Sequence, residues 1–298
     1  MNHERTPRMR TVLPSIRSTA LIAAIGCALA SAGVGAQGKA AESAGPYVPT
    51  PWAIVDEILT LAGVGPSDFV VDLGSGDGRL VLTAVTRFKA RGGFGVDIEA
   101  PLVADANDRA RRDGVADKAK FYVRDLFETK VGEASVVTLY LLPTSVPKLE
   151  PKLLAELAPG ARVVSHDYPF PDWPHDRYVK LDVPEKVAIT GTPRTTLYLY
   201  TVPARIGGEW ELRLPPSLAK EPLKVSVVQR ASGATAQVRV AQKTVAMPSV
   251  AVHATDVTFT LPAGVAGKNT VTLKGKASDK AIEGTIDGAK WRATRVDS

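Results

Sequence analysis

The 298-residue sequence predicts an α/β domain with a doubly wound, mostly parallel sheet, followed by a small antiparallel all-β domain, either a barrel or a sandwich. Three observations predict this. Between residues 47 and 202, apolar strand patterns alternate with helical patterns, which is typical of a parallel sheet with helices on both faces. After residue 202 the helical periodicity stops, and short alternating runs take over. The change falls in the segment PARIG, so we expect the domain boundary at 203–207 and the β domain over 207–298.

The elements of both domains follow in order from these patterns. Helical spacing of apolar residues predicts helices over 51–64, 79–88, 100–114 and 146–157, and apolar runs predict strands over 69–74, 92–98, 119–127, 134–142, 161–168 and 195–202. In the second domain, alternating runs predict strands over 208–215, 223–230, 234–241, 256–262, 269–277, 281–287 and 290–296.

The first 36 residues are predicted to be a secretory signal peptide. Four arginines precede a short apolar run of small residues that ends in Val-Gly-Ala, with Ala36 as the last residue removed. Lipoprotein processing at Cys27 is the alternative, but the apolar run continues past that cysteine. The run is too weakly apolar and Gly-rich for a permanent membrane span, so we expect no stable span after processing. We therefore expect a linker over 37–46 and an exported protein, in the periplasm or cell envelope.

Charge and cysteine content exclude several classes of function. Without residues 1–36, 33 basic residues face 30 acidic ones, so the formal net charge falls from +6 to +3 and a nucleic-acid partner is not supported. Cys27 is the only cysteine. A mature chain would therefore have no disulfide, no thiolate nucleophile and no cysteine metal ligand.

A glycine-rich loop follows the first predicted strand, in FVVDLGSGDGRL (69–80). Glycines at every second position let the backbone approach a ligand where a side chain would collide, at the edge where doubly wound sheets bind ligands. The spacing is neither the G-x-G-x-x-G of dinucleotide enzymes nor a P-loop. Asp72 and Asp77 would oppose a phosphate, so the loop favours a cationic or zwitterionic ligand.

Two further acids end the next two predicted strands. Asp97 follows Asp72 by 25 residues, at the place where a carboxylate accepts the hydroxyl protons of a ribose. Glu99, two residues on and on the same strand face, competes for this role. Asp125 ends the third strand and can accept from an exocyclic adenine amino group. Together with Asp72, these acids predict an adenosine with an attached amino acid.

The segments VVDLGSGDGR, GVDIE, VRDLF and VVTLYLLP resemble the motifs of class I S-adenosylmethionine-dependent methyltransferases. More narrowly, YVPTPWAIVDEIL, LYLLP and GARVVSHDY resemble the bacterial relatives of the mitochondrial lysine methyltransferases that modify the c subunit of ATP synthase. The resemblance covers residues 47–202 and implies a Rossmann-like methyltransferase fold with S-adenosylmethionine as cofactor. It implies the following binding residues: Asp72, Gly74, Ser75, Gly76 and Gly78 around the methionine part, Asp97 at the ribose, and Asp125 with Leu126 at the adenine.

The methyl acceptor is less defined by the sequence. The signature Asn/Asp-Pro-Pro-Tyr/Phe of many small-molecule and DNA amine methyltransferases is absent, which argues against methylation of bases, and we expect a protein side chain such as lysine. Tyr140, at the end of the fourth strand, is the first catalytic candidate, although it can equally be a core aromatic. His166, Asp167 and Tyr168, at the end of the fifth strand, are the next candidates. The His/Asp-rich stretch from 165 to 176 matches no zinc spacing, so no metal site is expected; we expect Trp173 to lie over the active site.

Two features leave alternatives open. Gly208-Glu209-Trp210 and the run from Trp291 to Arg295 resemble the G-x-W and closing Arg of calycin-like barrels, in which the Arg packs over the Trp. An exported chain also conflicts with a cofactor made in the cytosol. Either the first segment is not used for export, or the exported protein keeps a methyltransferase fold without turnover, or it binds another nucleoside-like ligand.

Overall fold

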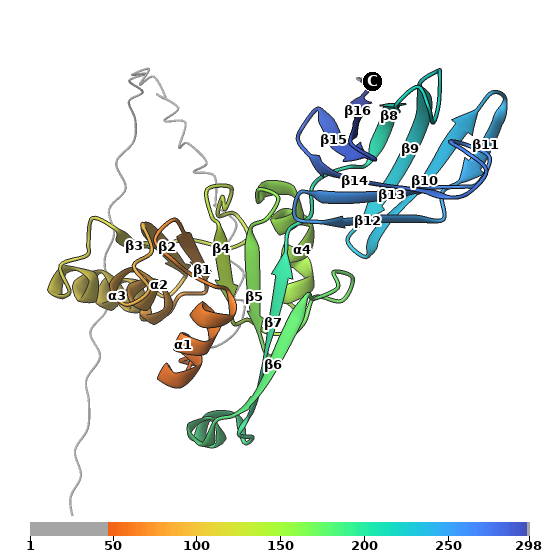
Figure 1. Cartoon of the computed structure of the whole chain (residues 1–298). Coiled ribbons are helices and arrows are strands. Elements are labelled where there is room, and N and C mark those ends of the chain that lie inside the picture. The colour runs from red at the N-terminus through yellow and green to blue at the C-terminus, as the bar shows by residue number, and fades with distance from the viewer. Residues whose placement is uncertain (1–46, 297–298) are drawn as a thin grey trace, which may run out of the picture. The chain divides into compact units, whose positions relative to one another are not determined.

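The computed structural model describes residues 47–296, so the predicted signal peptide and linker lie outside the described residues. Its first sheet contains β1 (Phe69–Leu73), β2 (Gly92–Asp97), β3 (Ala119–Val123), β4 (Val136–Leu139), β5 (Arg162–His166), β6 (Arg177–Asp182) and β7 (Arg194–Thr201). The strand order is β3-β2-β1-β4-β5-β7-β6, and the first five strands in this order pair in parallel. β7 pairs antiparallel with both β5 and β6. The predicted, mostly parallel α/β sheet is confirmed (Figure 1).

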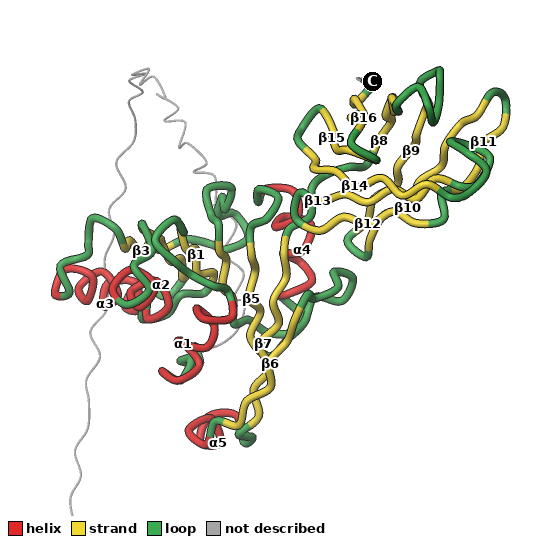
Figure 2. Tube along the Cα trace, in the orientation of Figure 1, coloured by secondary structure: helices red, strands yellow, loops and turns green. Residues whose placement is uncertain are grey.

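Helices cover both faces of this sheet (Figure 2). They are α1 (Trp52–Leu61), α2 (Arg79–Thr86), α3 (Ala100–Arg112) and α4 (Val146–Glu156), with a short 3-10 turn η1 (Pro184–Lys186) and α5 (Val187–Thr190) between β6 and β7. Neighbouring strand residues point to opposite faces. Val71 and Val137 therefore pack with Leu149 of α4, whereas Val70 and Val136 pack with Ile54 of α1. None of the helices described in residues 47–296 is long and apolar enough to cross a membrane.

The topology brings one set of loops together. The carboxyl ends of the parallel strands β1 to β5 meet at one edge of the sheet, the edge at which open α/β folds bind ligands. Because β7 runs antiparallel to β5, the turn between β6 and β7 returns to the same edge. The sequence pattern missed β6, since most of its residues are exposed and only Val179 and Leu181 alternate toward the core.

The second sheet is antiparallel and contains β8 (Gly208–Arg213), β9 (Leu223–Arg230), β10 (Gly233–Val240), β11 (Lys243–Ala246), β12 (Ser249–His253), β13 (Asp256–Leu261), β14 (Val271–Ala277), β15 (Ala281–Ile286) and β16 (Ala289–Arg295). Its order is β11-β10-β9-β8-β16-β15-β14-β13-β12, a single curled sheet. The expected antiparallel β domain is therefore confirmed at this level. Trp210 is 1% exposed, and the Arg295 guanidinium lies 4.4 Å from the centroid of its ring, the contact that the calycin-like pattern predicts.

Candidate functional site

A pocket lies at the carboxyl edge of the first sheet. It is lined by residues from the loops after β1, β2, β3, β4 and β5, by the segment before α1, and by Thr190 of the β6–β7 turn. The lining residues are Tyr47, Val48, Pro49, Thr50, Asp72, Gly74, Ser75, Asp77, Arg79, Leu80, Asp97, Ile98, Glu99, Arg124, Leu126, Tyr140, Leu141, Leu142, Tyr168 and Thr190. The structure therefore brings together residues that are more than 140 positions apart in the sequence.

The glycine-rich loop is shaped by the protein's own packing. Gly74, Gly76 and Gly78 have φ angles of 86°, 50° and 78°, a region that residues with a Cβ rarely adopt. A Cβ on Gly76 would lie 2.3 Å from the ring of Tyr47, and one on Gly78 would lie 2.6 Å from Phe121. Their spacing in the sequence predicts close approach of a ligand. The structure adds a second reason for glycine, because neighbouring side chains already occupy the space that a Cβ would need.

Asp72 places a carboxylate in the interior beneath this loop. It is 3% exposed, and its Oδ1 accepts a hydrogen bond of 2.7 Å from the Thr138 hydroxyl. Burial raises its pKa to about 7; the nearby charges of Asp97 and Asp77 add to the shift, and the bond from Thr138 opposes it. A positively charged group in the pocket would therefore stabilise the ionised form of Asp72.

Asp77 differs from Asp72 because two arginines neutralise it. Arg79 forms a two-pronged contact with its carboxylate, at 2.8 and 2.7 Å, and Arg109 adds a bond of 3.0 Å. Burial alone would raise the pKa of Asp77, but the hydrogen bonds and charges of Arg79 and Arg109 hold it below its usual value. The sequence predicted that Asp77 would oppose a phosphate, but it did not show that Arg79 and Arg109 bind this carboxylate. In the structure its charge is compensated, so Asp72, Asp97 and Glu99 remain as the acids that favour a cationic or hydroxyl-rich ligand.

Both candidates for a ribose contact line the pocket. Asp97 accepts hydrogen bonds from the backbone N–H of Gly76 at 2.8 Å and of Glu99 at 3.0 Å. These bonds tie the end of β2 to the glycine-rich loop. Glu99 is exposed at the edge of the pocket. The choice between the two, which the sequence left open, stays a prediction.

The two residues predicted to contact the adenine, Leu126 and Asp125, have different surroundings in the structure. Leu126 is buried and lines the pocket. Asp125 is half-buried, and its Oδ1 accepts a 2.8 Å bond from the N–H of Phe127, which closes the turn after β3. In the described structure Asp125 therefore shapes the loop that presents Leu126.

An unpaired buried atom tests whether a ligand fits here. The Ser75 hydroxyl oxygen is buried without a hydrogen-bond partner in the described residues, although Ser75 lines the pocket. Buried polar groups are normally satisfied by protein or ligand. A donor-rich, positively charged amino-acid group of a cofactor matches both this hydroxyl and the carboxylate of Asp72.

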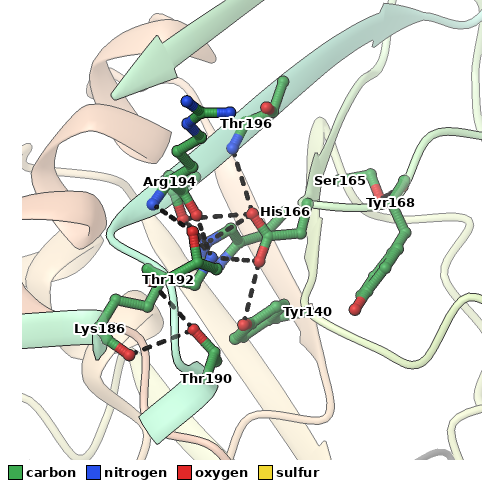
Figure 3. A network of polar contacts seen from close by, with 11 residues as sticks. Tyr140, Ser165, His166, Tyr168, Lys186, Thr190, Thr192, Arg194 and Thr196 are labelled. Carbon is green, nitrogen blue, oxygen red and sulfur yellow. Dashed lines mark hydrogen bonds and ion pairs between the residues drawn. The ribbon is translucent and has the colours of Figure 1, made fainter. Parts of the chain in front are cut away.

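Tyr140 and His166 lie together in a network of polar contacts (Figure 3), and Asp167 joins them in one cluster through a hydrogen bond from Tyr140. The Tyr140 hydroxyl donates to Asp167 Oδ2 at 3.1 Å, and its ring stacks on the imidazole of His166, with centroids 3.8 Å apart. Tyr140 lines the pocket; His166 is completely buried behind it, and neither His166 nor Asp167 is among the lining residues. A role for His166 or Asp167 in the reaction would therefore act through Tyr140.

The protonation states of this cluster follow from its bonds. Burial lowers the pKa of His166 to about 4, so its ring is neutral near pH 7. The Thr195 hydroxyl donates its proton to Asp167, so His166 Nε2, 3.0 Å from that oxygen, carries the ring proton. Burial and the charge of Asp167 raise the pKa of Tyr140 well above its usual range. None of these groups is a strong base near neutral pH.

Several site residues were not predicted from the sequence. Lys186, in the turn between β6 and β7, contacts Asp167, and Thr190 lines the pocket, as does Tyr168, which the sequence had already offered as a candidate. Helical or strand periodicity gave no signal for that turn. Trp173, predicted to lie over the site, is instead 4% exposed and packs in the core with Phe170 and Tyr200. Within residues 47–296, no group of three or more His, Cys, Asp or Glu side chains is arranged to hold a metal ion.

Comparisons with known proteins agree with this geometry. Residues 72–177 match the family model of the ANTKMT methyltransferase domain. A protein-lysine N-methyltransferase of Saccharolobus islandicus is 37% identical over 157 residues, which are 53% of this chain and 93% of that protein. The rat lysine N-methyltransferase named for the c subunit of ATP synthase is 38% identical over 136 residues, 44% of this chain and 59% of that protein. The chain thus spans about three fifths of this mammalian relative.

A crystal structure described as an RNA methyltransferase from Salinibacter ruber with S-adenosyl-L-homocysteine is 44% identical, covering 53% of this chain and 96% of that one, with a TM-score of 0.48. The sequence relationships, above all the one that extends over nearly the whole archaeal enzyme, identify the family. The chain belongs to the class I S-adenosylmethionine-dependent methyltransferases, with S-adenosylmethionine as its cofactor.

Proposed function

We propose that this enzyme transfers a methyl group from S-adenosylmethionine to the side-chain amine of a lysine in a protein substrate. The observation that carries the proposal is the 37% identity to a protein-lysine methyltransferase over 93% of that enzyme's length. The rat relative, a lysine methyltransferase named for the c subunit of ATP synthase, supports it. The pocket is compatible with this acceptor, because Tyr140, Leu142 and Tyr168 contribute apolar surface to its lining, on which an extended lysine side chain can pack.

The acidic side of the pocket is proposed to hold the cofactor. Asp72 and the Ser75 hydroxyl would receive the amino-acid group, close to the backbone of Gly74, Gly76 and Gly78. Asp97 would hold the ribose, with Glu99 as the alternative. Leu126 would pack on the adenine, and Asp125 would flank it. When bound, S-adenosylmethionine supplies an electrophilic methyl group on a sulfonium.

The residues on the acceptor side are proposed to orient a neutral amine. The Tyr140 hydroxyl donates its hydrogen bond to Asp167, so the phenolic oxygen can accept an N–H from the lysine. The nitrogen lone pair then remains available to form the new N–C bond, and the electrons of the broken C–S bond stay on sulfur. Positioning of this kind can contribute up to about 7 to 11 kcal/mol. Because the cluster offers no strong base, the amine must lose its proton to water before the transfer.

Transfer of a labelled methyl group tests the proposal. Poly-L-lysine and the purified c subunit of ATP synthase serve as acceptors, and acid hydrolysis of the product identifies the methylated residue. We expect methyl-lysine, and about a 10-fold or greater loss of kcat/KM in Tyr140→Phe. Tyr122→Phe, which changes an exposed tyrosine on β3 that does not line the pocket, is the matched control and should stay within about twofold.

Two results would contradict the proposal differently. If S-adenosylhomocysteine binds but label appears on neither acceptor, while a cell extract yields labelled nucleic acid or a small molecule, lysine is the wrong acceptor. If the cofactor binds and no fraction of the extract is labelled, the chain is a binding protein without turnover.

A further inference from the structure

Lys186 is a buried cation in the turn between β6 and β7 (Figure 3). Its residue is 3% exposed, and its ammonium donates to the Arg194 carbonyl at 3.0 Å, to the Thr195 hydroxyl at 2.6 Å and to the carboxylate of Asp167. An ammonium group has three donors, and all three are used here. Lys186 is therefore committed to the protein interior and is not available to a ligand.

The carboxylate that Lys186 holds is the centre of the cluster. Asp167 has a φ of 65°, in the left-handed region that residues with a Cβ rarely adopt. Its Oδ1 accepts from the Thr196 N–H at 3.1 Å and from the Thr195 hydroxyl at 3.2 Å, and its Oδ2 accepts from Tyr140 and Lys186. Burial alone would raise the pKa of Asp167, but His166, Lys186 and the Thr196 N–H together lower it. Asp167 is therefore a fixed, ionised acceptor.

The orientation of Tyr140 depends on this carboxylate. The stacked imidazole of His166 fixes the plane of the phenol ring, and the bond to Asp167 fixes where the hydroxyl proton points. The Lys186 ammonium also lies 5.9 Å from the centroid of the Tyr140 ring. Without the ammonium, Asp167 would be a buried charge with no cation, and it would shift or take up a proton. Either change would release the Tyr140 hydroxyl.

We propose that Lys186 is a positioning residue for methyl transfer: by holding Asp167, it keeps the Tyr140 hydroxyl proton away from the acceptor, so that the phenolic oxygen receives an amine N–H. The inference rests on the proposed function, since it assigns the acceptor a nitrogen. Lys186 acts only through Asp167 and Tyr140.

A spectroscopic experiment tests the positioning without any acceptor. The protein has seven tyrosines, so labelling with ¹³Cζ-tyrosine gives a countable set of NMR signals, and Tyr140→Phe assigns the one from Tyr140. We expect Lys186→Met to shift the Tyr140 signal. Lys180→Met, the same change at an exposed lysine of β6, should leave it in place.

Kinetics test the consequence for transfer. With poly-L-lysine as acceptor, we expect Lys186→Met to lower kcat about 10-fold. The dissociation constant of S-adenosylhomocysteine, measured by calorimetry, should stay within about twofold. The acids proposed to bind the cofactor contact elements other than the β6–β7 turn, so the change at Lys186 should not reach them. Adding Tyr140→Phe to Lys186→Met should cost little more than either change alone, since both act on one hydroxyl. Lys186→Arg should retain more activity than Lys186→Met.

The outcomes separate the inference from the proposed function. An unmoved Tyr140 signal in Lys186→Met overturns the inference, and so do fully additive losses in the double variant. If poly-L-lysine is not methylated by the unmodified enzyme but the signal moves, the positioning holds and the acceptor is wrong. If Lys186→Met does not fold, the double variant Asp167→Asn, Lys186→Met removes both buried charges together. If that double variant folds and its Tyr140 signal is unchanged, the inference is again overturned.

Discussion

The carboxylate of Asp72 lies in the interior of the fold, and its ionisation is costly there. Its pKa in the folded protein is about 7, chiefly because of burial, against an ordinary value of 3.8. The folded state therefore holds a proton over a pH range in which the unfolded chain has lost it. This cost disappears when a positive group lies beside the carboxylate, so a cationic ligand and Asp72 stabilise each other.

Replacing Asp72 by Asn should stabilise the protein without cofactor at alkaline pH. The contribution of Asp72 to the stability of the unmodified protein falls as pH rises from about 4 to about 7 and then levels off, because the full ionisation cost is present only above the folded-state pKa. At pH 8 we expect Asp72→Asn to gain about 2 to 4 kcal/mol, and at pH 4 almost nothing. Urea unfolding at both pH values measures this.

The exposed Asp117→Asn is the control and should be neutral at both pH values. A gain at pH 8 no larger than that at pH 4 would show that Asp72 is not the group responsible. Asp72→Asn should also weaken S-adenosylmethionine binding, because the carboxylate that would meet the ammonium group is gone.

Gly78 joins the glycine-rich loop to α2 and lies beside β3 and α3. It is the residue before the helix, in a left-handed conformation, and its α-carbon faces Phe121 of β3 and Ala106 of α3. A single methyl group added there would collide with two elements at once. The stability of this region therefore depends on packing around the loop as much as on hydrogen bonds within it.

Gly78→Ala should lower the free energy of unfolding by about 2 to 4 kcal/mol, from the strained φ and from contacts of 2.6 and 2.9 Å. Gly65→Ala is the matched control, because nothing lies within 4 Å of its added methyl group. We expect it to change stability by less than about 1 kcal/mol. Equal effects in urea unfolding would mean that packing against Phe121 is not what requires glycine at 78.

Periodicity predicted the buried elements and failed at the exposed ones. β1, β2, β4 and β5 have buried apolar runs and were predicted close to their observed bounds. β6, β11 and β12 were missed because most of their residues are exposed and their apolar positions are few, two at most facing a core in each strand. The glycine-rich loop and the acids at the strand ends could likewise be predicted, since each lies next to a buried strand.

The other contacts of the site depend on the tertiary fold and not on local sequence. Lys186 reaches Asp167 only because β7 pairs antiparallel with β5 and brings the β6–β7 turn back to the carboxyl edge. No local pattern around Lys186 encodes that return. Nor could a sequence show that Arg109, on α3, neutralises Asp77 32 positions away.

The α/β sheet and the β sheet have separate cores. The clusters around β1 to β7 and the cluster around Trp210 and Trp291 share no buried residue, and every pocket-lining residue falls between 47 and 190. Between them, the Arg205 guanidinium donates to the carbonyls of Leu154, Ala155 and Leu157 at the end of α4. Such a basic side chain satisfies groups that a helix leaves unpaired.

A fragment of residues 47–207, which keeps Arg205, should therefore bind S-adenosylhomocysteine within about threefold of the full chain, because it contains the whole pocket. Calorimetry measures the affinity, and circular dichroism confirms folding. A folded fragment whose affinity falls more than about tenfold would mean that the β domain supports the pocket. Where the enzyme acts stays a prediction; sequencing the N-terminus of the native protein tests whether residues 1–36 are removed.

The packing of Tyr47, Phe121 and Leu141 against the three glycines has a kinetic consequence. A loop that protein contacts already hold in shape does not have to be ordered when a ligand arrives, so little conformational entropy is lost on association. Encounter and orientation, rather than ordering of the loop, should then limit the rate at which the cofactor enters. Differences in affinity between the methylated cofactor and its demethylated product should appear as differences in residence time.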